Sequence, residues 1–142
     1  MDNPTARKFL IDQGTAHLTQ RNPEALLLRL DRGEAPIPGQ MTSVLLALKV
    51  TYKALDGEAM IDRELAQALH RLARDSRRAL QAGRDRGVVW PPLLVEDLDR
   101  IEEAVEAILS GVWDLPASQV TLSGQVTRSL PVQLTPPSQT EI

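Results

Sequence analysis

An apolar repeat in the second half of the sequence constrains the fold more than any other feature. Between residues 60 and 111, apolar and small residues recur at intervals of three and four positions. This spacing places them on one face of a helix, because an α-helix turns once in about 3.6 residues. We predict two long amphipathic helices, over 60–82 and 94–111, whose apolar faces must be buried. These faces comprise Leu65, Leu69, Leu72, Ser76, Ala79 and Leu80 in the first helix, and Leu98, Ile101, Val105, Ile108 and Val112 in the second.

Three more helices are expected earlier in the chain. Two short segments share a pattern in which Asn-Pro opens a helix and Gly closes it in a left-handed conformation, which predicts helices over 4–13 and 23–32. The segment 41–55 is apolar around most of its circumference, so we expect it to lie buried at the centre of the fold. Two short and three longer helices with short connections indicate a compact all-α bundle over residues 1–112.

The composition changes sharply at residue 113. Residues 113–142 are rich in Pro, Ser, Thr and Gln and carry almost no charge, so we interpret them as a flexible C-terminal tail. Apolar residues at even positions between 120 and 134 are typical of a strand, but several prolines weaken that pattern. Three interpretations stay open: a tail disordered in isolation, a strand or hairpin of its own, and a strand added to a partner's sheet.

Length and composition exclude several classes of protein. The chain has 142 residues, of which 42% are hydrophobic and 25% charged, as in a single globular domain. It contains no cysteine, which excludes disulfides and thiolate zinc sites and suits a reducing compartment, so we expect the cytoplasm. No apolar run is long enough to cross a bilayer and no signal-peptide pattern is present, so we expect no membrane partner.

The sequence shows no motif for catalysis or cofactor binding. It lacks phosphate-binding glycine loops and histidine–glutamate metal motifs. Of the two histidines, His17 is expected to be exposed in a polar linker and His70 lies among arginines. The hydroxyl of Ser76 is expected to bond to a main-chain carbonyl on the apolar side of its helix. We therefore expect no enzyme, no cofactor and no metal, and keep a small-ligand sensor or enzyme with an inter-helix pocket as an alternative.

The outer faces of the two long helices carry opposite charges. Residues 62–87 contain seven arginines and four acidic residues, whereas residues 88–112 contain one arginine and six acidic residues. The candidate binding residues on these faces are Arg63, Arg71, Arg74, Arg77 and Arg78 in the first helix, and Glu96, Asp99, Glu103 and Glu106 in the second.

Three interpretations of the arginines stay open: a solvated face with ion pairs, a docking surface for an acidic protein or a second copy, and a nucleic-acid contact. Scarce lysines and aromatic residues count against nucleic acid. Opposite charges orient a partner, and a two-fold dimer would set the basic helix of one copy against the acidic helix of the other. We expect a protein-binding, adaptor or assembly protein that acts through these faces and the tail, with a nucleic-acid-associated regulator as the alternative.

The two tryptophans both flank predicted boundaries. In the Trp90-Pro91-Pro92 crossover, the ring is expected to cap the end of the core. If Trp90 and Trp113 were exposed, they would instead form an anchor for a partner, because tryptophan is enriched at interface hot spots. Both are therefore included among the candidate protein-binding residues.

Overall fold

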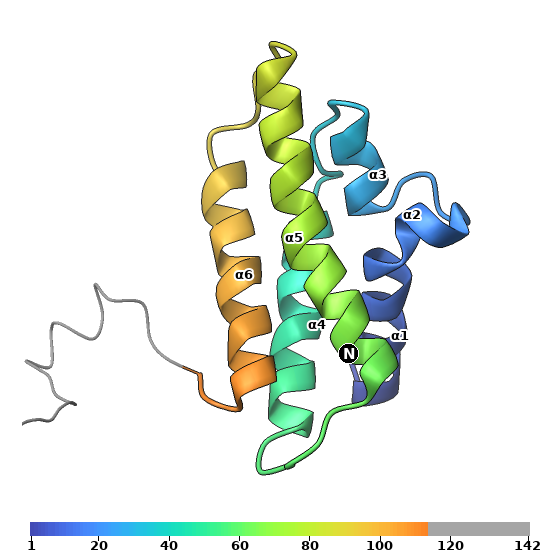
Figure 1. Ribbon diagram of the computed structural model, residues 1–142, viewed down its shortest axis with the longest axis vertical. Helices are drawn as coiled ribbons and strands as arrows, with labels where there is room; N and C mark the ends of the chain where they lie inside the picture. Colours follow the sequence, from blue (N-terminus) through green and yellow to red (C-terminus); the bar gives the residue numbers. More distant parts are fainter. Residues whose placement is uncertain (114–142) are drawn as a thin grey trace, which may run out of the picture. The chain divides into compact units, whose positions relative to one another are not determined.

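The computed structural model describes residues 1–113, which contain helices and no strand (Figure 1). The helices are α1 (Asn3–Gly14), α2 (Ala16–Thr19), α3 (Leu26–Asp31), α4 (Gln40–Ala54), α5 (Arg63–Asp85) and α6 (Leu94–Ser110). The predicted all-α bundle is confirmed. The interpretations of the tail fall on residues outside the described part of the chain, apart from Trp113, and the boundary at residue 112 stays a prediction.

Four helices form a ring around the core. Helix α1 packs against α4 and α5, and α6 packs against the same two helices, so that α4 and α5 lie on opposite sides of the core. Figure 1 shows that α5 and α6 run antiparallel as neighbours on one side of the bundle. Helix α3 packs against the upper half of α5 and α2 packs against α3, so the two short helices cover one end of the ring.

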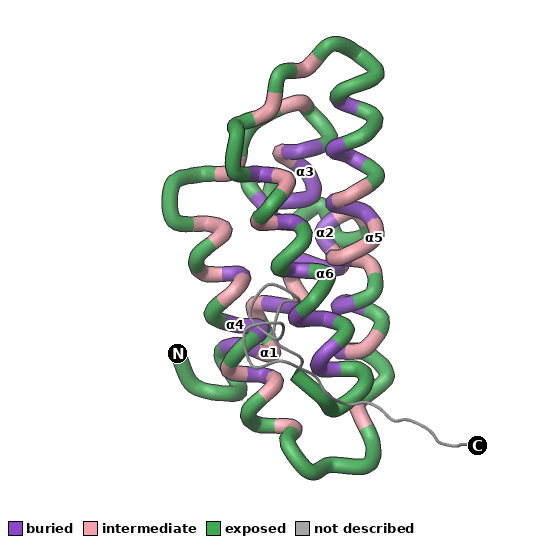
Figure 2. The backbone as a smooth tube through the Cα atoms, turned by 90° about the vertical axis from the view of Figure 1, so that its left-hand side faces the viewer, coloured by how far each residue is buried: buried purple, intermediate pink, exposed green. Residues whose placement is uncertain are grey.

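The core consists mainly of leucine side chains, with Leu10, Leu48, Leu69 and Leu98 each supplied by a different helix of the ring. Burial of one such side chain contributes about 1.5–3 kcal/mol. The predicted apolar face of α5 is buried along its whole length, as Figure 2 shows by its row of buried positions. The face of α6 is buried too, except that Val112 lies beyond the helix and is 58% exposed.

Helix α4 is not the buried centre that its sequence predicts. Only Val44, Ala47, Leu48 and Thr51 are buried, and Leu46 on the outer side is 45% exposed. Other apolar side chains of the helix, such as Leu45 and Val50, pack against the core but are only partly buried. The physical reason is the ring arrangement, in which every helix keeps one outer face. Among the described residues, none of the helices has the length and apolar character needed to cross a membrane.

The first short helix ends differently from the prediction. Gly14 is the last residue of α1 and does not have a positive φ, whereas Gly33 does adopt the predicted left-handed conformation, with φ of 77°. A Cβ at position 14 would lie 2.2 Å from the Ala68 carbonyl oxygen on α5. Glycine is needed there because the two backbones approach closely, and the chain turns directly into α2, which the sequence pattern does not predict.

The second short helix starts later than the Asn-Pro pattern predicts. Asn22 forms a local turn, in which its Oδ1 accepts a hydrogen bond from the Glu24 N–H at 3.1 Å. The helix begins at Leu26, whose N–H donates to the Oε1 of buried Gln13 at 3.0 Å. A side chain of α1 therefore satisfies the first N–H of α3.

Candidate functional site

A groove runs along the outside of the bundle between α5 and α6. It has a volume of about 400 Å³, and we call it the α5–α6 groove. Its lining comprises His70, Ala73, Arg74, Arg77 and Arg78 from α5, and Glu102, Val105, Glu106 and Leu109 from α6. Four of the residues singled out from the sequence, Arg74, Arg77, Arg78 and Glu106, thus meet at one surface.

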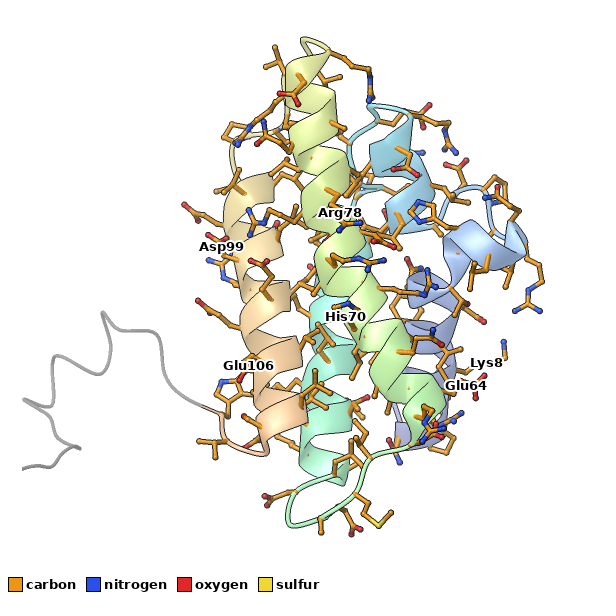
Figure 3. The ribbon with its side chains drawn as sticks, in the orientation of Figure 1. Lys8, Glu64, His70, Arg78, Asp99 and Glu106 are labelled. Carbon is orange, nitrogen blue, oxygen red and sulfur yellow. The ribbon has the colours of Figure 1, made fainter. Side chains whose placement is uncertain are left out.

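The groove has an apolar floor and two charged walls. Ala73, Val105 and Leu109 form the floor, and Leu109 is 45% exposed. Arginines of α5 form one wall and glutamates of α6 form the other. In Figure 3, Arg78 and Asp99 lie towards one end of the two helices and His70 and Glu106 lie further towards the other, as antiparallel packing requires.

Arg77 crosses the groove within a single chain. Its Nη2 donates to Glu102 Oε1 at 2.7 Å and also to Asp99 Oδ1. These hydrogen bonds, that from Glu102 foremost, raise the pKa of the Arg77 guanidinium above its ordinary value. The finding corrects, for Arg77, the prediction that the two charged rows lie on outer faces and point into water. Arg77 lies on the side of α5 that adjoins α6, so at this level the rows meet.

Arg74 also has a partner within the chain. Its Nε donates to the Asp75 Oδ1 at 2.9 Å, and Asp75 is buried on the side of α5 away from the groove. A hydrogen bond to a buried carboxylate is costly to remove, because the carboxylate would be left without it in a poorly solvated place. Arg74 therefore has a structural contact besides its place in the groove wall.

Besides Arg63, four of the candidate residues on the outer faces have no side-chain hydrogen bond or ion pair within residues 1–113. They are Arg71 and Arg78 on α5 and Glu103 and Glu106 on α6. Arg71 lies seven positions before Arg78 and continues its row beyond the groove. Unpaired charges of both signs, on either side of an open apolar floor, distinguish this surface from the rest of the bundle.

The remaining predicted residues on the charged faces lie outside the groove. Arg63 is the first residue of α5 and is exposed. Glu96 lies in the first turn of α6, where its Oε1 is 3.8 Å from the Arg100 Nη2. Such an exposed pair contributes at most about 1 kcal/mol.

The two tryptophans differ in their surroundings. The Trp90 Nε1–H donates to the Leu80 carbonyl at 2.9 Å, and a Cβ at Gly83 would lie 2.3 Å from the Trp90 ring. The ring therefore packs on α5 at the end of the core, as the core-capping interpretation of Trp90 expects. Trp113, the last described residue, is 40% exposed.

A cluster around His17 is the main feature that the sequence analysis missed. His17 lies in α2 and is not in an exposed linker. Its Nε2 contacts Asp31 of α3, and its Nδ1 is 3.5 Å from the Oδ2 of Asp75. The signal was present in the spacing, since Asp75 falls three residues after Leu72 and four before Ala79 on the apolar side of α5.

The His17 cluster connects helices and does not form a catalytic arrangement. An imidazole between two carboxylates joins α2, α3 and α5, and no nucleophilic side chain contacts it in the described part of the chain. No group of three or more histidine and acidic side chains among residues 1–113 is placed to hold a metal ion. The hydroxyl of Ser76 donates to the Ala73 carbonyl at 3.2 Å, which confirms that prediction.

Two other surface pockets have fewer features of a binding site. One lies among Arg7, Lys8, Asp12, Arg21 and Glu64, where every charged side chain already pairs with an opposite charge. The other lies between the proline-rich connectors at 36–39 and 91–94, next to Asp97, which accepts a hydrogen bond from Arg100. Neither combines an open apolar floor with unpaired charges.

In comparisons with known proteins, no family model, no curated protein and no solved structure matches this chain. Function is therefore inferred from the surface chemistry of the bundle. The α5–α6 groove is the place where that chemistry is concentrated.

Proposed function

We propose that this is a non-catalytic assembly or adaptor protein that binds a helix of another polypeptide in the α5–α6 groove. One observation carries the proposal: arginines of α5 and glutamates of α6 line the two sides of an apolar floor, and Arg78 and Glu106 among them have no partner within residues 1–113. A helix with apolar residues on one face, acidic residues along one edge and basic residues along the other would cover the floor and pair with both walls. Residues 113–142 stay in the proposal as a second contact segment.

Apolar contact and charge contribute differently to such binding. Covering the floor removes apolar surface from water, which contributes about 25 cal/mol per Å². The charged walls contribute orientation and rate of association more than affinity. A groove with walls of opposite sign therefore selects both the kind of helix and its direction.

The absence of a catalytic role is part of the proposal. The groove lining contains one histidine and no serine, threonine or cysteine, so a nucleophile beside a base is not assembled there. We also propose a reducing compartment such as the cytoplasm, because the chain has no cysteine.

The test is binding of a labelled amphipathic peptide with leucines on one face, glutamates along one edge and lysines along the other, followed by fluorescence anisotropy. We expect the full chain to bind it, and the double substitution Arg71→Glu and Arg78→Glu to weaken binding at least about tenfold, or 1.4 kcal/mol. The matched control reverses Arg63 and Arg84, exposed arginines that lie near the two ends of the same helix and away from the groove.

Two results would contradict the proposal: no binding by the unmodified chain, or an equal loss in the control variant. Binding of a labelled DNA duplex in place of the peptide, with affinity that falls steeply as salt is raised, would support the nucleic-acid alternative. Circular dichroism of each variant checks that the bundle is intact.

A further inference from the structure

We infer that the occupant of the α5–α6 groove is a second copy of this chain, related by a two-fold axis parallel to α5 and α6. The inference rests on the proposed function and names its partner. It starts from charge complementarity, because each wall of the groove carries the charge that the other wall lacks. A surface of this kind is complementary to itself, which is what a two-fold interface needs.

Charge decides between the two possible directions of the axis. When two copies face each other, the two-fold axis lies in the plane of the interface. An axis perpendicular to the helices would place α5 against α5 and α6 against α6, so that like charges meet. An axis parallel to the helices places α5 of each copy against α6 of the other, so that opposite charges meet twice.

The spacing of the charges fits the parallel axis. On the outer face of α5, Arg71, Arg74 and Arg78 follow one another at intervals of three and four residues. On α6 the outer acids Asp99, Glu103 and Glu106 follow at intervals of four and three. Since the helices run antiparallel, the two rows have the same spacing in space, and each spans about 10.5 Å.

Arg77 fixes how the two rows are aligned in height. It bonds to Asp99 and Glu102 in its own chain, so these positions lie level with it. Because the two helices run antiparallel and both rise about 1.5 Å per residue, moving three residues back along α5 reaches the same height as moving three residues forward along α6.

A two-fold axis parallel to the helices leaves heights along them unchanged, so the same levels apply between copies. The expected contacts with the second copy are therefore Arg78 with Asp99, Arg74 with Glu103, and Arg71 with Glu106. The apolar surface between the rows, which comes mainly from half-exposed Leu109 and partly exposed Ala73, would then be covered by its own equivalent.

The size of this face predicts a weak dimer. Helix α6 has 17 residues and is about 25 Å long. Two helices side by side are about 20 Å wide, so the face buries about 500 Å² on each copy. The total lies at the low end of the range for specific interfaces. We therefore expect a dimer that dissociates on dilution and with added salt, since the charged rim is screened.

The experiment measures the mass of the full chain by sedimentation velocity over a range of concentrations, with two charge-reversal variants. The basic-wall variant carries Arg71→Glu and Arg78→Glu, and the acidic-wall variant carries Glu103→Lys and Glu106→Lys. All four residues lack a partner within the described part of one chain, so their replacement leaves the ion pairs within the bundle in place.

The unmodified chain should shift from the mass of one copy towards that of two as concentration rises. Each variant alone should stay at the mass of one copy, because like charges then meet in four of the six expected pairs. An equimolar mixture of the two variants should associate more strongly than either variant alone, because opposite charges then meet in four of the six expected pairs, against two of six in each variant alone. Reversal of Arg63 and Arg84 should leave the dimer unchanged.

Two outcomes would overturn the inference. A chain that keeps the mass of one copy at every concentration has no such dimer, and peptide binding would then leave the proposed function standing. A dimer that survives in either variant alone, or a mixture that fails to associate while the unmodified chain dimerises, would place the contact elsewhere or along the other axis. Failure of both dimerisation and peptide binding would remove the proposed function as well.

Discussion

Single side chains connect segments that are distant in the sequence. Gln13 of α1 satisfies the first N–H of α3, and His17 of α2 contacts carboxylates on α3 and α5. Arg77 links α5 to α6. Each of these contacts holds a short or charged segment in place, so that the leucine core can remain largely free of polar groups.

Thr51 is an exception within the core. Its Oγ1 is buried and has no hydrogen-bond partner within residues 1–113. We expect Thr51→Val, which keeps the shape and removes the hydroxyl, to raise the free energy of unfolding by about 1 kcal/mol. Urea unfolding measures this change. The control Thr51→Ser keeps the hydroxyl and loses the methyl group, and should be destabilising; a loss of stability in Thr51→Val would contradict the prediction.

The start of α5 carries a pH-dependent contact. A hydrogen bond from Arg7, aided by the Leu65 N–H, holds the pKa of Asp62 below its usual value of 3.8. A carboxylate with a lowered folded pKa stabilises the fold above its unfolded pKa, and that contribution is lost as the pH falls through the folded value. The contribution is therefore complete at neutral pH and is lost progressively in acid, as the pH falls from the unfolded pKa through the lowered folded pKa.

We expect Arg7→Gln to lower the urea midpoint slightly at neutral pH, with the difference from the unmodified chain vanishing in strong acid. Asp62→Asn should behave in the same way, because asparagine keeps the helix cap and loses only the charge. A difference that stays constant at every pH would show that Arg7 acts through packing alone.

At the scale of the helices, the spacing of apolar residues predicts the buried face well where the helix is long. Helices α5 and α6 follow it closely, because more than four turns of consistent spacing leave one buried face. Helix α2 has four residues, too few to carry a period, and the start of α3 depends on Gln13, thirteen residues away. Neither is encoded locally, so the sequence pattern did not predict them.

The packing of α1 on α5 depends on Gly14. We expect Gly14→Ala to lower the free energy of unfolding by about 2–3 kcal/mol, because the new Cβ would lie 2.2 Å from the Ala68 carbonyl oxygen. The obstacle is backbone, so removing the neighbouring side chain with Ala68→Gly should not rescue the variant. Thermal unfolding followed by circular dichroism measures both. Full stability in Gly14→Ala would contradict the close approach of the two helices.

At the scale of the molecule, the sequence predicted which residues face outward but not which of them meet. The charged rows on α5 and α6 follow from the helical period, and three of the arginines and one glutamate line the groove. The pairing of Arg77 with Asp99 and Glu102 depends on which helices are neighbours and on their relative rotation. Those properties are set by packing of the whole bundle, and a single helix pattern does not contain them.

The place of α5 in the bundle also bears on how the chain folds as it is made. Helices α1 and α3 both pack against α5, and α5 ends at Asp85. The first 39 residues therefore leave the ribosome long before the helix that supports them exists. During that interval α1 and α3 are too short to persist as isolated helices. Helix α4 offers α1 one partner earlier, but synthesis must run well past the middle of the chain before α1 and α3 have α5 to pack against.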